Sequence, residues 1–282
     1  MKTMLITDFK SQEFQTNKMS IIDFHTHAFA DALAPRAIAK LSQSANARAY
    51  HDGTLTGLLS SMDHAGIDCS LILSIATRPE QFEPILRWSE QIRSKRILPL
   101  ASVHPDDPQA LAHIRQVAEA GLPGIKLHPY YQNFRLDEGR MLPLYEVIQD
   151  CGLLLICHTG FDQAFPRDRR AEPKRIMRVL DQLPKLKFVA THLGAWCDWE
   201  EMRRHMLGRP IWMDLAFALE FMDATTSRAL LMEHPAEYLL FGTDSPWADQ
   251  TEAVGQLRRL GLARELEDMI LGGNAARLLN IH

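Results

Sequence analysis

The sequence predicts an α/β protein that folds as one (β/α)8 barrel, a TIM barrel of parallel strands. Short apolar segments alternate along the chain with segments of helical period, which is typical of βα units and a parallel sheet. Eight strands can be placed in this way, the number that closes a barrel. The chain has 282 residues, of which 46% are hydrophobic, and barrels of about 250 residues are commonly single domains.

The predicted elements form a single domain, residues 20–282, after a short N-terminal extension, residues 1–19. Met19 is an alternative start of the chain. The strands are expected at Ile21–Phe24, Ser70–Ile75, Ile97–Ser102, Gly124–Leu127, Leu153–Cys157, Lys187–Ala190, Ile211–Leu215 and Tyr238–Phe241.

Apolar residues at helical spacing predict the helices between the strands. Three such stripes cover residues 55–62, 141–148 and 176–183. Gly66 is placed to end the first of these helices, and Pro173 stands where a first helical turn tolerates proline. A last short helix is expected at residues 274–279. We interpret every stripe as packing against the barrel, and none of them indicates a site.

The composition excludes several classes of function. The formal net charge is −4 and no basic stripe is present, so a nucleic acid is not expected as a partner. No segment has the roughly 18 apolar residues of a membrane helix or the apolar block of a signal peptide. The four cysteines are scattered, which favours a reducing compartment, and we expect a cytoplasmic protein. A homodimer is the default expectation for a soluble enzyme of this kind.

Two histidines follow the first predicted strand. Side chains alternate along a strand, so His25 and His27 point the same way and can share one metal ion. By the same alternation Asp23 lies one step deeper, where we expect it to accept the ring N–H of a ligand histidine. On its own this pair fits two ordinary loop histidines better than a metal site.

Polar residues also follow the fifth, sixth and eighth predicted strands. His158, His192 and Asp244 each stand where an apolar strand gives way to a glycine or proline turn. Because the carboxyl ends of barrel strands meet at one mouth, these side chains are expected to converge with the first-strand pair. The fourth strand adds Lys126 and His128 on one face. Burial of the lysine is costly unless it is modified, catalytic or paired with an acid, and the alternative to a functional role is a salt bridge to Asp23 or Asp244.

These residues, in this order, resemble the amidohydrolase superfamily, specifically the amidohydrolase-2 group of metal-dependent hydrolases and decarboxylases. The resemblance is carried by the segments IIDFHTH, GIKLHPYYQ, LLICHTG, ATHLG, LLFGTDSPW and ILGGNAARLL, which extend from Ile21 to Leu279. Each segment alone is a weak signal. The ordered set covers nearly the whole domain and is specific.

The resemblance implies a role for each matched residue. The metal ligands are His25, His27, His158 and Asp244. Asp244 also acts as the base that takes a proton from water. His192 is an acid-base residue in single-metal members and a ligand of the second ion in two-metal members. Lys126 stands where some two-metal members carry a carboxylated, bridging lysine, so the number of ions stays open.

Neutral imidazole and carboxylate suit Zn²⁺, although Mn²⁺ or Fe²⁺ also fits such ligands. We therefore expect one or two zinc ions and a metal-dependent hydrolase of a small carboxylate-bearing lactone, amide or ester. The alternative is a zinc-dependent decarboxylase of an aromatic or muconate-type acid. A barrel that binds metal without catalysis is a third alternative. The candidate substrate contacts are His128, Tyr130, Arg167 and Trp247. For Arg167 a solvated loop position is an equally good interpretation.

Overall fold

The computed structural model describes residues 20–281, and the predicted extension at residues 1–19 lies outside the described residues. Eight parallel strands form the centre of the molecule. They are β1 (Ile22–Thr26), β2 (Cys69–Leu73), β3 (Ile97–Leu100), β4 (Gly124–Leu127), β5 (Leu154–Cys157), β6 (Lys187–Ala190), β7 (Trp212–Asp214) and β8 (Leu239–Leu240). All eight lie within two residues of their predicted bounds. The ladders join β1 to β3 in one sheet and β4 to β8 in another.

Short bridges join the two sheets at both seams. Ala101, just after β3, pairs in parallel with Ile125 of β4. At the other seam Thr26 of β1 pairs with Ser245, which follows β8. Backbone hydrogen bonds support both seams, including Lys126 N–H to the Ala101 carbonyl at 2.9 Å and Phe24 N–H to the Phe241 carbonyl at 2.8 Å. The strands therefore form a ring, and the predicted α/β barrel fold is confirmed.

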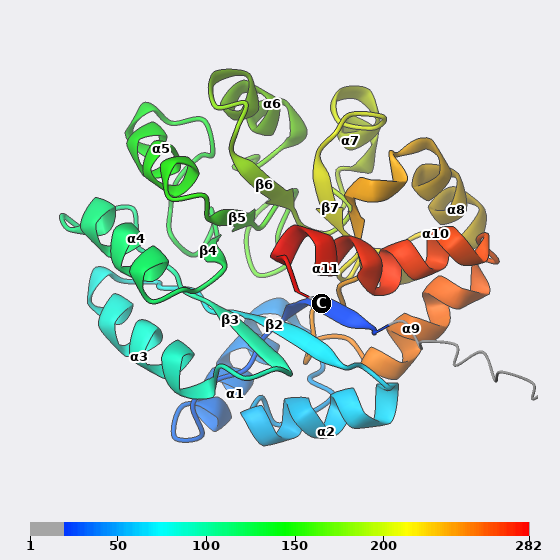
Figure 1. The fold of residues 1–282 in the computed structure, drawn as a ribbon, viewed down its shortest axis with the longest axis horizontal. Helices are drawn as coiled ribbons and strands as arrows, with labels where there is room; N and C mark the ends of the chain where they lie inside the picture. Colours follow the sequence, from blue (N-terminus) through cyan, green and yellow to red (C-terminus); the bar gives the residue numbers. More distant parts are fainter. Residues whose placement is uncertain (1–19, 282) are drawn as a thin grey trace, which may run out of the picture.

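Helices surround this ring in Figure 1. They are α1 (Ala34–Ala45), α2 (Leu55–Ala65), α3 (Phe82–Ile92), α4 (Ala110–Glu119), α5 (Leu142–Asp150), α6 (Pro173–Gln182), α7 (Trp199–His205), α8 (Ala224–Glu233), α9 (Gln250–Arg259), α10 (Arg264–Asp268) and α11 (Asn274–Leu279). Gly66 ends α2 in a left-handed conformation with φ of 70°, as predicted, because glycine has no Cβ to oppose it. Pro173 begins α6. No helix among residues 20–281 is long and apolar enough to cross a bilayer.

Two apolar cores hold the layers together. The larger fills the space between the strands and the outer helices. The smaller lies inside the ring and is formed by residues such as Ile22, Phe24, Leu71, Ile156 and Leu240. Helix α11 packs against this inner core through Ala275 and crosses the near end of the ring in Figure 1. One end of the barrel is thus closed by apolar packing, which leaves the carboxyl ends of the strands for polar side chains.

Gly160, in the loop that follows β5, shows how tightly the loops are held at this open end. Its φ is 84°, and a Cβ added there would lie 2.1 Å from the backbone nitrogen of Trp196. Gly208 has a similar φ of 77°, but a Cβ there would meet nothing within 4 Å. We expect Gly160→Ala to lower the free energy of unfolding by about 1–3 kcal/mol more than Gly208→Ala, because only Gly160 adds overpacking to the backbone strain. Urea denaturation of both variants measures the difference, and equal losses would contradict the packing argument.

Candidate metal centre and active site

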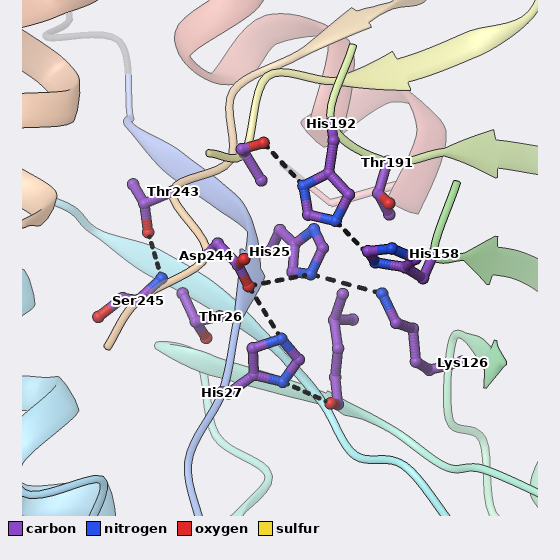
Figure 2. A network of polar contacts seen from close by, with 12 residues as sticks. His25, Thr26, His27, Lys126, His158, Thr191, His192, Thr243, Asp244 and Ser245 are labelled. Atoms are coloured by element: carbon purple, nitrogen blue, oxygen red, sulfur yellow. Dashed lines mark hydrogen bonds and ion pairs between the residues drawn. The ribbon is translucent and has the colours of Figure 1, made fainter. Parts of the chain in front are cut away.

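Four histidines and one aspartate converge at the carboxyl ends of the strands, where Figure 2 shows them facing one another. His25 is in β1 and His27 follows it, while His158 follows β5, His192 follows β6 and Asp244 follows β8. His27 Nε2 lies 3.0 Å and His25 Nε2 lies 3.4 Å from Asp244 Oδ1. His192 Nε2 lies 3.0 Å from His158 Nδ1. The convergence predicted from the strand ends is therefore present.

Each of these imidazoles has its second ring nitrogen held by an oxygen that accepts a hydrogen bond. His27 Nδ1 donates to the Leu73 carbonyl at 2.9 Å, and His25 Nδ1 donates to Asp214 Oδ2 at 2.9 Å. His158 Nε2 donates to the Phe161 carbonyl at 2.9 Å. His192 Nδ1 donates to the Ala216 carbonyl at 2.8 Å. A neutral imidazole carries one proton, so the nitrogen that remains on each ring is an unprotonated acceptor.

The remaining acceptor atoms point at one another. His158 Nδ1 and His192 Nε2 lie 3.0 Å apart with their lone pairs toward each other, and the Nε2 atoms of His25 and His27 face the Asp244 carboxylate. Such contacts repel unless a cation lies among them. Around a tetrahedral zinc with ligands at about 2.0–2.2 Å, neighbouring ligand atoms stand roughly 3.4 Å apart. The observed spacing of 3.0–3.4 Å therefore fits the donor set of a divalent metal.

Burial keeps three of the four imidazoles neutral. It lowers the pKa of His25, His158 and His192 well below the ordinary value of 6.5, and neighbouring cationic groups lower it further. Metal binding requires the unprotonated ring, so burial favours the metal-binding form at neutral pH. Ligand atoms of His25, His192 and Asp244 all lie within 4.8 Å of one another. A second group with this property consists of His128, His158 and Asp162.

Asp214 at the end of β7 orients both sides of the cluster, and the sequence interpretation missed it. Its Oδ2 holds His25, while its Oδ1 accepts the backbone N–H groups of His192 at 2.9 Å and Ala216 at 3.1 Å. Burial raises the pKa of Asp214 to about 7, against the opposing effects of those N–H groups and of Lys126. The signal was present in the sequence, since an aspartate ends an apolar strand there as it does after β8.

The structure assigns Asp23 a different role from the predicted one. Its carboxylate accepts hydrogen bonds from Thr243 Oγ1 at 2.6 Å and Gln250 Nε2 at 2.7 Å and does not hold a ligand ring. The register of β1 against β2 shifts between Asp23 and Thr26. This bulge breaks the two-residue alternation on which the prediction depended, so Asp23 and His25 no longer share a face.

His192 and Asp244 both adopt backbone conformations that side-chain-bearing residues rarely take. Their φ values are 59° and 69°. Backbone hydrogen bonds hold both turns: Leu193 N–H donates to the Asp214 carbonyl at 2.6 Å, and Asp244 N–H donates to the His25 carbonyl at 2.8 Å. Left-handed residues other than glycine cost free energy and concentrate at functional sites. Here the turns direct the two side chains toward the centre of the cluster.

Lys126 of β4 is 1% exposed and extends its amine to 3.4 Å from His25 Nε2. Burial lowers its pKa, while the charges of Asp214 and Asp244 oppose that effect. Among the described residues it forms no ion pair within 4.0 Å, so the pairing with Asp23 or Asp244 that was one alternative is absent. The cluster thus contains a buried amine that lies near the ring of His25 and has no acid within ion-pair distance.

A cavity of about 780 Å³ opens from the cluster. Of the predicted substrate contacts, His128 and Trp247 line it, whereas Tyr130 and Arg167 do not. The Tyr130 hydroxyl donates to the carbonyls of Gly160 and Asp168 at 2.9 and 2.7 Å, which fixes a loop. The Arg167 guanidinium lies 4.6 Å from the ring centroid of Phe161.

Several residues that line the cavity were not among the candidate sites. One of these is Asp162, whose Oδ2 lies 3.3 Å from Nε2 of His128. The ring of His128 in turn stacks on that of His158, with centroids 4.2 Å apart. Asp162 is in a long loop after β5, and nothing in the local sequence indicates that the loop returns to the mouth.

Replacing Asp214 with asparagine tests the fixing of the histidine tautomers. The amide oxygen can keep the two backbone hydrogen bonds, but the amide nitrogen then faces His25 Nδ1 and places the ring proton on Nε2, the metal-facing atom. We expect Asp214→Asn to weaken metal binding about 10- to 100-fold, the usual effect of losing such a partner, with little change in thermal stability. Competition with a chromogenic chelator measures the affinity.

A matched control for this variant is Asp107→Asn. It removes the acid of another partly buried Asp–His pair, in which His113 Nδ1 lies 2.6 Å from Asp107 Oδ2, away from the cavity. This variant should leave metal affinity unchanged. If Asp214→Asn binds metal as tightly as the control, Asp214 does not set the tautomer of His25.

Comparisons with known proteins identify the family and the fold. A family model described as "Amidohydrolase" (Amidohydro_2) matches residues 22–281. No curated protein matches the chain. Among solved structures, 5-carboxyvanillate decarboxylase from Sphingomonas paucimobilis is 18% identical with a TM-score of 0.68, covering 94% of this chain and 100% of the other.

Two further solved structures are similar in fold. A probable 2-pyrone-4,6-dicarboxylic acid hydrolase from Acinetobacter baumannii is 15% identical, with a TM-score of 0.66 and coverage of 93% and 100%. An uncharacterised TIM-barrel protein from Bordetella bronchiseptica is 21% identical, with a TM-score of 0.71 and coverage of 93% and 98%. At these identities the structures establish the shared fold, while the family model spans nearly all of the described residues. The chain therefore belongs to the amidohydrolase-2 family, whose members are metal-dependent hydrolases or decarboxylases.

Proposed function

We propose that the protein is a metal-dependent hydrolase of a small carboxylate-bearing lactone, amide or ester. The observation that carries the proposal is the set of four imidazoles whose outer nitrogens are all committed as donors. Their unprotonated nitrogens are left for a metal, and those of His25 and His192 lie within 4.8 Å of each other and of the Asp244 carboxylate. Nitrogen and oxygen ligands of this kind suit Zn²⁺, with Mn²⁺ and Fe²⁺ as alternatives. The cation, when bound, supplies Lewis acidity to water and to a carbonyl oxygen.

Side chains of the cluster and of the cavity wall transfer protons and position the substrate. Asp244 is near His25 and His27 and also lines the cavity, so it takes the proton of the attacking water as general base. His192 donates a hydrogen bond outward to Ala216 and keeps an unprotonated Nε2 toward the cluster. In a single-metal site this nitrogen can therefore accept the water proton from Asp244 and pass it to the leaving group. His128 and Trp247 position the substrate from the cavity wall. Because all four cysteines are free, we place the reaction in the reducing cytoplasm.

Lys126 links the proposal to the number of metal ions. If its amine is carboxylated, it becomes an anionic ligand that bridges two ions, and His158 with His192 binds the second. If it stays an amine, its place beside His25 Nε2 suits a contact with the carboxylate of a substrate at a single-metal site. The first case favours hydrolysis, and the second leaves both reactions open.

The second candidate function is a decarboxylase of an aromatic or muconate-type acid. The apolar part of the cavity wall favours it, since the cavity lining includes Phe29, Phe161, Trp196 and Phe217. An apolar wall disfavours a carboxylate in the ground state and favours a neutral product such as CO₂. Solved structures of similar fold include 5-carboxyvanillate decarboxylase and a probable pyrone hydrolase, so relatives of this barrel are named for both reactions.

The metal content of the purified full-length protein tests the proposal most directly. We expect one or two zinc ions per chain by elemental analysis and complete loss of turnover on chelation, with recovery when Zn²⁺ is added back. The assay panel consists of carboxylate-bearing lactones, aryl esters and amides, with CO₂ release from aromatic acids as the decarboxylase arm. Full activity of the metal-free protein would contradict both candidate functions, because both require the metal. CO₂ release without hydrolysis would replace the first by the second.

Asp244→Asn tests the general base. The amide keeps an oxygen that can bind metal but cannot accept the proton of water. We expect kcat to fall by about 10²- to 10⁴-fold, the usual contribution of a general base, while the far-UV circular dichroism spectrum is unchanged. Asp249→Asn, at the N-cap of α9 beyond the cavity, is the control and should retain activity. Turnover at the wild-type rate in Asp244→Asn would remove the aspartate from this role.

A further inference from the structure

The cavity is larger than the cluster requires and continues under helix α1. Its volume of about 780 Å³ is that of pockets that take drug-sized ligands, larger than a single ring. Besides the metal cluster, its lining includes one face of α1 and the first turns of α3. We call this second part, formed by Leu33, Ala37, Leu41, Ile85 and Trp88, the α1 chamber.

Helix α1 presents two rows of residues at four-residue spacing. Leu33, Ala37, Leu41 and Ala45 form an apolar row, and all four line the cavity. Residues at this spacing share one face of a helix. Ala34 is the only buried residue of α1, and Leu33 just before it is 42% exposed, so protein covers the apolar row only in part. An apolar row that faces a cavity and stays partly uncovered is suited to bury the apolar part of a ligand.

A short basic row runs beside the apolar one. Arg36 and Lys40 both line the cavity and are exposed. Within residues 20–281 neither side chain forms an ion pair. The acids that line the cavity, Asp162 and Asp244, are both at its metal end. The two cations are therefore available to an anion at the outer edge of the chamber.

The helix is anchored through a residue outside the two rows, Ile38. Ile38 packs on Gly53, where an added Cβ would lie 2.6 Å from the Ile38 side chain and 3.3 Å from Phe29. Gly53 has φ of 75° and its carbonyl accepts the Phe29 N–H at 2.8 Å. The apolar and basic rows are thus held toward the cavity by a contact that does not involve the chamber.

We propose that the α1 chamber binds an apolar arm of the substrate, and that Arg36 and Lys40 pair with an anionic group at the far end of that arm. The substrate class is then an amphipathic acid with a reacting group at the metal end, an extended apolar segment and a second carboxylate or comparable anion. This inference rests on the proposed function for the reacting end and adds the arm, which the strand-end residues do not determine.

Linear carboxylic acids probe the chamber without turnover. Binding of pentanoate, decanoate and decanedioate to the full-length, zinc-loaded protein is measured by isothermal titration calorimetry. We expect decanoate to bind at least about tenfold more tightly than pentanoate, because additional methylenes are buried. Decanedioate should bind about three- to tenfold more tightly than decanoate at low salt, with the difference falling as salt rises.

Two variants, each with a control, separate the contribution of the apolar arm to binding from that of the anionic group. Ala37→Phe fills the chamber and should abolish the preference for chain length, whereas Ala39→Phe, at an exposed position of α1 outside the cavity, should keep it. Arg36→Gln with Lys40→Gln should abolish only the preference for the second carboxylate. Arg87→Gln with Lys95→Gln removes two exposed cations that do not line the cavity and should change nothing.

The outcomes are distinct from those for the proposed function. Equal affinities for the three acids in the wild-type protein would overturn the inference, even if zinc-dependent turnover is found. A preference for chain length that survives Ala37→Phe would also overturn it, since the arm would then bind elsewhere. A preference that follows the variants as expected supports the chamber even if the assay panel detects no hydrolysis.

Discussion

The site depends on where four imidazole protons are placed. A buried neutral histidine binds metal only through the nitrogen that carries no proton, and the acceptor on its other side decides which nitrogen that is. Here the acceptors are the carbonyls of Leu73, Phe161 and Ala216 and the carboxylate of Asp214. Three of these four acceptors belong to a different strand or loop from the ring that they hold, and only Phe161 is in the same loop as its histidine. Closing the barrel therefore does more than bring ligands together, because it also fixes the protonation of each.

The same requirement explains the irregular backbone of the barrel mouth. A regular strand β1 would have placed Asp23 on the side of His25, and the bulge between Asp23 and Thr26 prevents this. Asp23 instead holds Thr243 and Gln250 and so ties β1 to the segment that carries Asp244. The left-handed turns at His192 and Asp244 are held by hydrogen bonds to the neighbouring strands. Deviations from ideal geometry are thus concentrated where the ligands are aimed.

These features also mark the limit of what the sequence could predict. Strand positions follow from apolar segments, and the five ligand candidates follow from polar residues after them, since both are local patterns. The partner of His25 is Asp214 and not the predicted Asp23. This outcome depends on a register shift in β1 and on contact between β1 and β7, which no local pattern encodes. Arg167 has the right charge for a substrate carboxylate but stacks on Phe161 instead, because loop conformation decides the direction of a long side chain.

The metal ligands and the outer part of the cavity wall are carried by different parts of the chain, the strand ends and the connecting helix α1, so substrate specificity can change separately from ligand geometry. The metal cluster is built from strand ends whose positions the closed ring fixes, so a change there alters ligand geometry, tautomer and neighbouring hydrogen bonds together. Helix α1, in the connection between β1 and α2, contributes a row to the cavity wall but no atom to the cluster. Its anchoring contact between Ile38 and Gly53 is equally separate from the ligands. Substitutions along α1 can therefore change which substrate arm is accepted while the chemistry at the strand ends stays intact, which is how one barrel can serve acids of different length.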